Sequence, residues 1–201
     1  MEQLNDTLIS GSVFNDVVKD EKFYMITDSN DENHGYAING LIGTISAEMD
    51  LDGSVYYTGG IEIVTEAKLI ESINGFKNDP MYIYVITVPN DCIVFIEDNV
   101  IKVNKLCTTN RIMIDELPMW TDECECKKII SLYPLLVRFM NHNDGDLEDV
   151  YIRSMTLDPR AIQFIKNKTP ELCRFAVQLS GDNLKYIDDQ TDDLCMLAVT
   201  N

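Results

Sequence analysis

The chain has 201 residues, of which 45% are hydrophobic and 25% charged, a profile typical of a folded protein with one domain or two small ones. Its formal net charge of −18 disfavours direct binding to nucleic acid and to anionic lipid. No apolar run approaches the ~20 residues of a membrane span, and the start lacks a secretory signal pattern, so we expect neither membrane insertion nor secretion.

The acidic residues are concentrated in the first part of the chain. Residues 1–118 carry a net charge of −13, and residues 119–201 carry a net charge of −5. Such a surface favours solubility, and it also favours a basic protein partner or mimicry of the charge of a nucleic acid. The sequence therefore predicts a protein partner, with a basic one favoured, and leaves a homo-oligomer open.

Short hydrophobic segments between turn residues predict mainly antiparallel strands in the first 120 residues, after a weak helical pattern near residues 14–20. A helix over residues 65–76 is expected to be capped by Thr65 and ended by Gly75. Gly59 and Gly60 indicate positive φ or a close backbone approach. Strands are expected at residues 22–27, 35–43, 53–64 and 81–89, and as a hairpin at 92–106 that turns at Asp98 and Asn99.

Helical spacing replaces the strand patterns after residue 120. Residues 121–139 place apolar side chains on one helical face, with Thr121 as the expected N-cap. Pro134 is expected to kink or divide this helix. We therefore predict an α+β fold in two domains. Residues 1–120 form a mixed, mainly antiparallel sheet with one or two helices, and residues 121–201 form an all-helical, solenoid-like region.

One block of the helical region occurs twice. The sequence IKNKTPELCRFAV, at residues 165–177, nearly recurs as IDDQTDDLCMLAV, at residues 187–199, with identical residues at six aligned positions. A weaker copy lies upstream, at residues 147–155, and the same shift relates it to the first block. The pattern predicts about three 22-residue hairpins of two short helices, the first degenerate, each burying its apolar face against the next. Thr169 is an expected N-cap, with Pro170 as the first helical residue.

The repeat also predicts a buried core. Its apolar positions share one helical face, and the paired cysteines are expected to act as buried small hydrophobic residues. The expected core residues are Ile165, Leu172, Cys173, Ala176, Val177, Ile187, Leu194, Cys195, Ala198 and Val199. An array that ends at such a repeat exposes its last face. We therefore expect that face to pair with a second copy or another protein, or the array to continue in a longer chain.

The two copies, in AIQFIKNKTPELCRFAV and LKYIDDQTDDLCMLAV, resemble a repeat family of unknown function that is abundant in giant DNA viruses of amoebae, the mimivirus group. This resemblance covers residues 158–200. The first part of the chain is similar to a domain that precedes ankyrin or similar repeats in mimivirus-type proteins. The matching residues are His34-Gly35-Tyr36, Gly59-Gly60-Ile61, and Thr87-Val88-Pro89 with Asp91. Glu62 departs from the pattern, which has an aromatic residue after Gly-Gly-Ile.

The resemblance implies a viral protein of uncharacterised activity. On this basis we expect a non-enzymatic protein–protein interaction module or scaffold that acts in the cytoplasm of the infected host cell. A structural component of the virus particle is the alternative without catalysis. Both readings leave the step of infection open.

A third reading is an active or degenerate enzyme. His34, in its His-Gly-Tyr setting, resembles the His-Gly pair on an early strand of ADP-ribosyltransferase-like folds, which also carry a tyrosine on a later strand. That resemblance makes Tyr57 the tyrosine and Glu97 the candidate acid, although no motif surrounds Glu97. The structural alternative is a His34 that is hydrogen-bonded within a turn.

The six cysteines, with no secretion signal, predict reduced thiols. Cys124 and Cys126 would bind zinc only if Cys92, Cys107 or His142 joined them, and a single C-x-C lacks the second pair that zinc sites show. The chain also lacks phosphate-loop, dinucleotide-binding and nucleophile-elbow motifs. We therefore predict no metal site and no cofactor.

Overall fold

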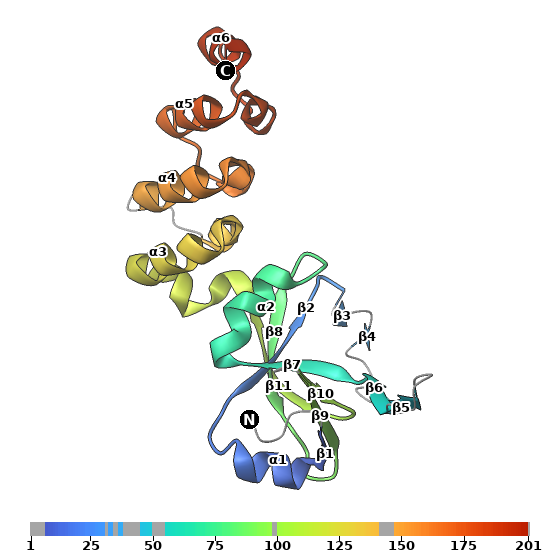
Figure 1. Cartoon of the computed structure of the whole chain (residues 1–201). Helices are drawn as coiled ribbons and strands as arrows, with labels where there is room; N and C mark the ends of the chain where they lie inside the picture. The colour runs from blue at the N-terminus through green and yellow to red at the C-terminus, as the bar shows by residue number, and fades with distance from the viewer. Residues whose placement is uncertain are drawn as a thin grey trace. The chain divides into compact units, whose positions relative to one another are not determined.

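The computed structural model of the chain describes residues 7–30, 32–33, 36–37, 45–49, 55–97, 100–140 and 147–200 (Figure 1). The chain divides into two compact units, Met1–Ile114 and Asp115–Asn201, and the sequence places the boundary at residue 120. The first unit combines a sheet with helices, whereas all the secondary structure described in the second unit is helical. The predicted α+β fold class is confirmed.

The first unit is built on a seven-stranded sheet in which every pairing is antiparallel. The spatial order is β1-β9-β10-β7-β2-β8-β11. The strands are β1 (Thr7–Ser10), β2 (Phe23–Thr27), β7 (Ile61–Thr65), β8 (Tyr82–Thr87), β9 (Ile93–Glu97), β10 (Val100–Val103) and β11 (Cys107–Met113). Strands β9 and β10 form the predicted hairpin, and its predicted turn residues, Asp98 and Asn99, lie outside the described residues.

Two shorter strand pairs accompany the sheet. They are β3 (Glu32–Asn33) with β4 (Tyr36–Ala37), and β5 (Ile45–Met49) with β6 (Val55–Gly59). Strand β6 joins β7 through Gly59 and Gly60, whose φ angles of 78° and 84° lie in the left-handed region. Glycine reaches this region without steric cost, so positive φ is confirmed as the role of both residues.

Two helices cover the sheet of the first unit. Helix α1 (Gly11–Val17) packs against β1 and β9, and α2 (Leu69–Gly75) packs against β2 and β7. All five residues of β2 are buried. Because successive side chains of a strand point to opposite faces, a strand buried at every position needs cover on both faces. Phe23 of β2 packs its ring 5.2 Å from that of Phe14 in α1, inside the main core cluster.

The predicted helix after β7 exists, but Thr65 does not cap it. The helix begins as the 3-10 helix η2 (Glu66–Lys68), and the Thr65 side chain makes no capping hydrogen bond. The strand alternation that buries Ile61 and Ile63 also turns Thr65 inward, so its hydroxyl lies away from the helix start. Leu69 of α2 is buried, as the apolar stripe predicts.

In the second unit, α-helices alternate with 3-10 helices. After η3 (Ile114–Glu116) and η4 (Pro118–Thr121), the elements are α3 (Glu123–Leu132), η5 (Pro134–Phe139), α4 (Glu148–Leu157), η7 (Pro159–Phe164), α5 (Pro170–Leu179), η8 (Gly181–Tyr186) and α6 (Asp192–Thr200). Helix α3 packs against α4, α4 against α5, and α5 against α6, while η5 packs against η7 and η7 against η8 (Figure 1).

Threonine side chains cap two of these helices. Thr169 Oγ1 accepts a hydrogen bond from the Leu172 N–H at 3.2 Å, and Pro170 is the first residue of α5. Both predictions for this helix are confirmed. Thr191 has the same place before α6, where its Oγ1 accepts from the Leu194 N–H at 3.4 Å. Each cap satisfies an N–H group that has no partner inside the helix.

The predicted division of the first helical segment is confirmed, but its predicted cap is wrong. Helix α3 ends before Pro134, which opens η5. The cap of α3 is Asp122, whose carboxylate accepts a hydrogen bond from the Glu125 N–H at 2.9 Å. Thr121 belongs to the preceding 3-10 helix, and its hydroxyl donates to the Pro118 carbonyl oxygen at 2.7 Å. This bond holds the Thr121 side chain away from the start of α3.

Most of the residues predicted for the repeat core are buried. Those no more than 8% exposed are Ile165, Leu172, Cys173, Ala176, Val177, Ile187 and Leu194. Cys195 and Ala198 are half-buried. Val199 departs from the prediction, because 78% of its surface is exposed. This exposure places Val199 on the side of α6 that is turned away from α5 and η8.

Candidate interaction surface

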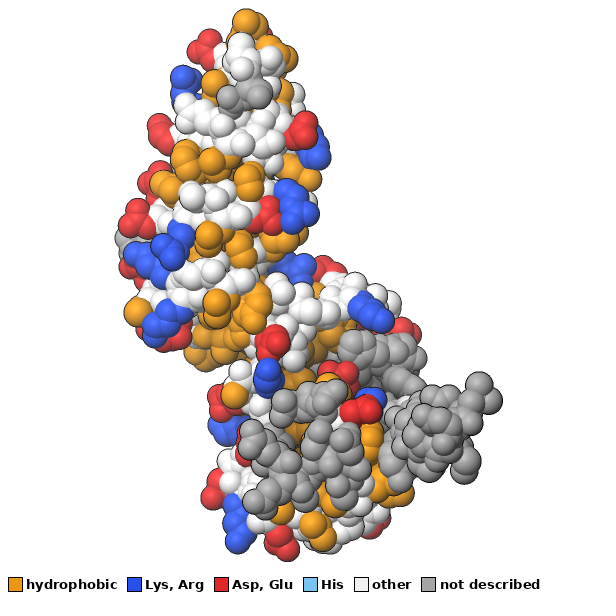
Figure 2. Space-filling model, viewed as in Figure 1, with side chains coloured by type: hydrophobic (Ala, Val, Ile, Leu, Met, Phe, Trp, Pro, Cys, Tyr) orange, Lys and Arg blue, Asp and Glu red, His pale blue; other side chains and the backbone are white. Residues whose placement is uncertain are grey.

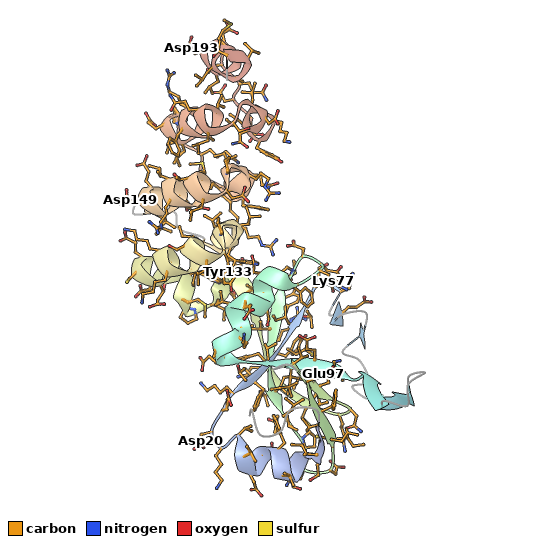
Figure 3. The ribbon with its side chains drawn as sticks, viewed as in Figure 1. Asp20, Lys77, Glu97, Tyr133, Asp149 and Asp193 are labelled. Carbon is orange, nitrogen blue, oxygen red and sulfur yellow. The ribbon has the colours of Figure 1, made fainter. Side chains whose placement is uncertain are left out.

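Of the three catalytic candidates, Glu97 alone has its side chain among the described residues. His34 lies outside them, and so does the side chain of Tyr57, which belongs to β6. Glu97, labelled in Figure 3, ends β9 and is half-buried. Its Oε2 lies 3.7 Å from Nζ of Lys102 on the neighbouring strand β10. The contact is a diagonal cross-strand ion pair, because Glu97 lies opposite Val100 and Lys102 opposite Phe95.

The cysteines differ in exposure. Cys92, Cys126 and Cys173 are buried, Cys107 and Cys124 are exposed, and Cys195 is half-buried. Burial is the main cause that raises the pKa of Cys126 to about 11, and its Sγ donates a hydrogen bond to the Trp120 carbonyl oxygen at 3.3 Å. Within the described ranges, no three His, Cys, Asp or Glu side chains are grouped closely enough to hold a metal ion. His142 lies outside those ranges.

A groove of about 930 Å³ runs between α3 and α4 of the second unit, and we name it the α3/α4 groove. Its lining comes from these two helices alone and includes Lys127 and Ser131 of α3, with Ile152, Arg153 and Leu157 of α4. Outward side chains that recur every three or four positions form a ridge along each helix. The hollow between the two ridges is the groove.

The lysines of the groove are paired with carboxylates. Lys127 Nζ lies 2.5 Å from Oε1 of Glu123 and 3.9 Å from Oδ2 of Asp149, which is labelled in Figure 3. Lys128 Nζ lies 2.6 Å from Oε1 of Glu125. The pKa of each lysine is raised above its ordinary value, chiefly by the hydrogen bond to its glutamate. These pairs leave little positive charge for an incoming ligand.

Arg153 is the exception among these basic residues. Its Nε donates a hydrogen bond to Ser131 Oγ at 3.0 Å, and in the part of the chain that the structure describes no carboxylate pairs with its guanidinium. The apolar side chains of Ile152 and Leu157 lie in the same groove and are 36% and 48% exposed. The groove therefore combines exposed apolar surface with a guanidinium that can bind a carboxylate through two parallel hydrogen bonds.

A second exposed surface, which we name the α6 patch, consists of Asp192, Asp193, Met196 and Val199. Met196 is 63% exposed and Val199 is 78% exposed. Asp192 and Asp193 form the first turn of α6, and neither is ion-paired within the described residues. Figure 2 shows hydrophobic side chains beside acidic ones at the α6 end of the second unit, and Figure 3 labels Asp193. The patch is both apolar and negative.

Sequence reasoning missed the α3/α4 groove. Three of its α4 residues, Asp149, Ile152 and Arg153, lie in the predicted degenerate copy at residues 147–155, in which only the apolar matches to the other copies were informative. A signal was nevertheless present, because Asp149, Ile152 and Thr156 recur at helical spacing on the face opposite the buried Val150. Isolated exposed hydrophobic residues are common on protein surfaces, so this spacing alone does not identify a contact surface.

The chain matches no protein-family model, no curated protein and no solved structure. None of the described helices has the length and apolar character that crossing a membrane requires. The α3/α4 groove and the α6 patch are candidate interaction surfaces of the second unit.

Proposed function

We propose that the protein is a non-enzymatic interaction module in which a solenoid of helical hairpins binds a protein partner through the α3/α4 groove. Each hairpin consists of an α-helix and the 3-10 helix that follows it: α3 with η5, α4 with η7, and α5 with η8. Helix α6 has the place of the α-helix of a further unit. A hairpin this short cannot bury its own apolar face, so stacking on a neighbour provides the core.

Equivalent side chains support this arrangement. Ile130, Met155 and Val177 have the same place in α3, α4 and α5, and all three are 0% exposed. The sequence separation from Ile130 to Met155 exceeds that from Met155 to Val177, and the extra residues fall in the connection between η5 and α4. Val199 is the next in this series, and it is the one without cover. Burial at this place thus depends on a following hairpin.

Buried hydrogen bonds join successive hairpins in the same way. Ser154 Oγ donates to the carbonyl oxygen of Pro134 at 2.7 Å, and Asn183 Nδ2 donates to that of Pro159 at 2.9 Å. Both prolines open the 3-10 helix of the preceding hairpin. Asn183 Nδ2 also donates to the Ala176 carbonyl oxygen at 3.0 Å. Such satisfied buried polar groups fix how one hairpin sits on the next.

The observation that carries the binding function is the α3/α4 groove itself. Covering the exposed apolar surface of Ile152 and Leu157 would lower the free energy of the complex. The guanidinium of Arg153 would add orientation, because its fork of donors matches a carboxylate. A binding surface on a stack of rigid hairpins is how repeat proteins commonly recognise partners.

The viral setting of this proposal rests on the resemblance of residues 158–200 to repeats of giant DNA viruses of amoebae. In that setting the protein is a scaffold in the cytoplasm of the infected host cell, or a component of the virus particle. Mass spectrometry of purified particles separates the two. Recovery in amounts comparable with known particle proteins supports the structural role, and its absence from particles supports action in the cell.

Beyond the groove, the net charge of −18 favours a basic partner. Attraction between an acidic surface and a basic protein is screened by salt, since the Debye length falls from about 10 Å at 0.1 M to about 3 Å at 1 M. Affinity for such a partner is therefore expected to fall as salt is added. An affinity that rises with salt would contradict this part of the proposal.

The groove is tested with a photo-crosslinker at Cys124, an exposed thiol in its lining. In a Cys195→Ser background used for both proteins, the full chain with Cys107→Ser is labelled at Cys124 with a benzophenone maleimide and illuminated in an extract of infected cells. We expect an adduct that Ile152→Glu abolishes. The control protein carries Cys124→Ser and the label at Cys107, on β11 of the other unit. The same adduct from both label positions, or an adduct insensitive to Ile152→Glu, would refute binding in the groove.

A further inference from the structure

We infer that the α3/α4 groove receives helix α6 of a second copy of this chain. The inference rests on the proposed function, because it names the partner of the same groove. Two exposed surfaces of the second unit support it, because they match each other in hydrophobicity, in charge and in size.

The apolar parts of the two surfaces are complementary. In the groove, Ile152 and Leu157 are partly exposed, and on the α6 patch Met196 and Val199 are 63% and 78% exposed. Met196 and Val199 are three residues apart and so neighbours on the helix surface. A nine-residue helix is about 13 Å long, which fits beside the two ten-residue helices that form the groove. Docking would cover all four side chains.

The charges are complementary too. Asp192 and Asp193 lie one turn before Met196, so they share its side of α6. Arg153 lies next to Ile152 in the groove and has no carboxylate partner among the described residues. If α6 of the second copy runs antiparallel to α3 and α4, its acidic first turn approaches Arg153 as Met196 reaches the apolar side chains. This direction also sets the helix dipoles antiparallel, which is favourable.

Packing of the hairpins against one another does not require an apolar side chain at the position of Met196. Ile152 in α4, Arg174 in α5 and Met196 in α6 have the same outward place in successive hairpins, at one constant separation in sequence. Arg174 is exposed although its helix is packed between two neighbours. A charged side chain is thus tolerated at this place. The two apolar residues of the series occur in the two surfaces that the inference brings together.

The partner must be a second molecule. Helix α5 packs against both α4 and α6, so it separates α6 from the groove of its own chain. The groove and the α6 patch are different surfaces, and a contact between them is heterologous. Such a contact leaves one groove and one α6 patch free after each addition. Association therefore produces chains or closed rings of copies.

The net charge of −18 on each copy opposes this association. The repulsion acts over long distances and is screened at physiological salt, where the Debye length is about 8 Å, whereas the contact between Arg153 and the aspartates acts at short range. The area of one short helix is small, so we expect dissociation constants on the order of 10–100 µM. Unlike binding to a basic partner, self-association is expected to persist at high salt.

The test uses sedimentation velocity on the full chain, from about 5 to about 500 µM at about 0.15 M and 0.5 M salt. We expect the mean mass of the wild type to rise with concentration. Arg153→Glu disables the groove, Met196→Glu disables the α6 patch, and each alone is expected to associate at least about tenfold more weakly. Because each variant keeps the surface that the other lacks, their mixture is expected to form a heterodimer and stop there.

Arg174→Glu, the same charge reversal on the intervening helix, is the matched control and is expected to assemble as the wild type does. Far-UV circular dichroism of every variant reports whether the helices remain folded. A wild type that stays monomeric up to about 500 µM, variants that assemble like the wild type, or a mixture that does not pair would each overturn the inference. If the wild type is monomeric but the label at Cys124 still captures another protein, this inference fails and the proposed function stands.

Discussion

The proposed stack makes its sharpest prediction at two valines that have the same place in successive hairpins. Val177 is 0% exposed between α5 and α6, whereas Val199 is 78% exposed on α6. Val177→Ala removes two buried methyl groups, at about 0.8 kcal/mol each. A residual cavity of up to roughly 50 Å³ adds about 1 kcal/mol. We expect the free energy of unfolding of the second unit to fall by about 2–3 kcal/mol.

The assay follows Trp120, the single tryptophan of the chain, during unfolding in urea. Trp120 is 1% exposed, and its ring stacks on that of Phe139 with centroids 5.7 Å apart, so its fluorescence reports the packing of the second unit. Far-UV circular dichroism on the same samples reports all helices. Agreement between the two signals indicates that the hairpins unfold together, as coupled neighbours in a repeat array do.

Val199→Ala is the matched control, because it makes the same chemical change at an exposed site. We expect it to alter the free energy of unfolding by less than about 0.5 kcal/mol. Equal effects of the two substitutions would show that burial by a following hairpin does not distinguish Val177 from Val199. The argument for a stack of equivalent hairpins would then be refuted.

Asp122→Ala is expected to lower the free energy of unfolding by about 1 kcal/mol, and Thr121→Ala by less, because the side chain of Asp122, not that of Thr121, caps α3. Urea titrations followed by tryptophan fluorescence compare the stabilities of the two variants. Cys126 should resist alkylation in the folded protein while the exposed thiols react, since burial raises its pKa to about 11; mass spectrometry of alkylated peptides checks this. The pKa of the Asp28 carboxyl is lowered, chiefly by the hydrogen bond from the Glu32 backbone N–H. Above the unfolded-state pKa of about 4, the wild type is therefore expected to be more stable than Asp28→Asn, and this difference is lost as pH falls through the folded-state pKa. Urea unfolding followed by circular dichroism at a series of pH values measures the difference.

Local signals in the sequence were sufficient for several elements. The Thr169-Pro170 pair predicts the start of α5, because a capping hydroxyl and a preset φ act within one turn. Gly59 and Gly60 predict the positive φ that joins β6 to β7. In each case the physical cause lies within a few residues of its effect, so the sequence alone was enough.

Other features depend on contacts that local patterns do not contain. Strand β1 pairs with β9, although the two lie far apart in the chain, and neither the strand nor the pairing has a local signal. Thr65 and Thr121 both looked like caps, but strand alternation buries the first and a hydrogen bond to the Pro118 carbonyl oxygen holds the second. A cap requires a side chain that points at the helix start, and tertiary packing decides that direction.

In the proposed stack, α3 and η5 are the first hairpin, and they illustrate why comparing a sequence with itself can miss a repeat. The sequence shift that relates the two clear copies also relates Met155 to Val177. Ile130 precedes Met155 by a longer interval than Met155 precedes Val177. A comparison of the sequence with itself at one fixed offset therefore does not find α3 and η5. Within each hairpin the 3-10 helix begins at the same sequence separation from the start of its α-helix, at Pro134, Pro159 and Gly181 alike. Stacking constrains the side chains between neighbouring hairpins, whereas the connection outside the stack is free to lengthen. A search that keeps the spacing within a hairpin and allows the connection to vary would have aligned all three buried residues.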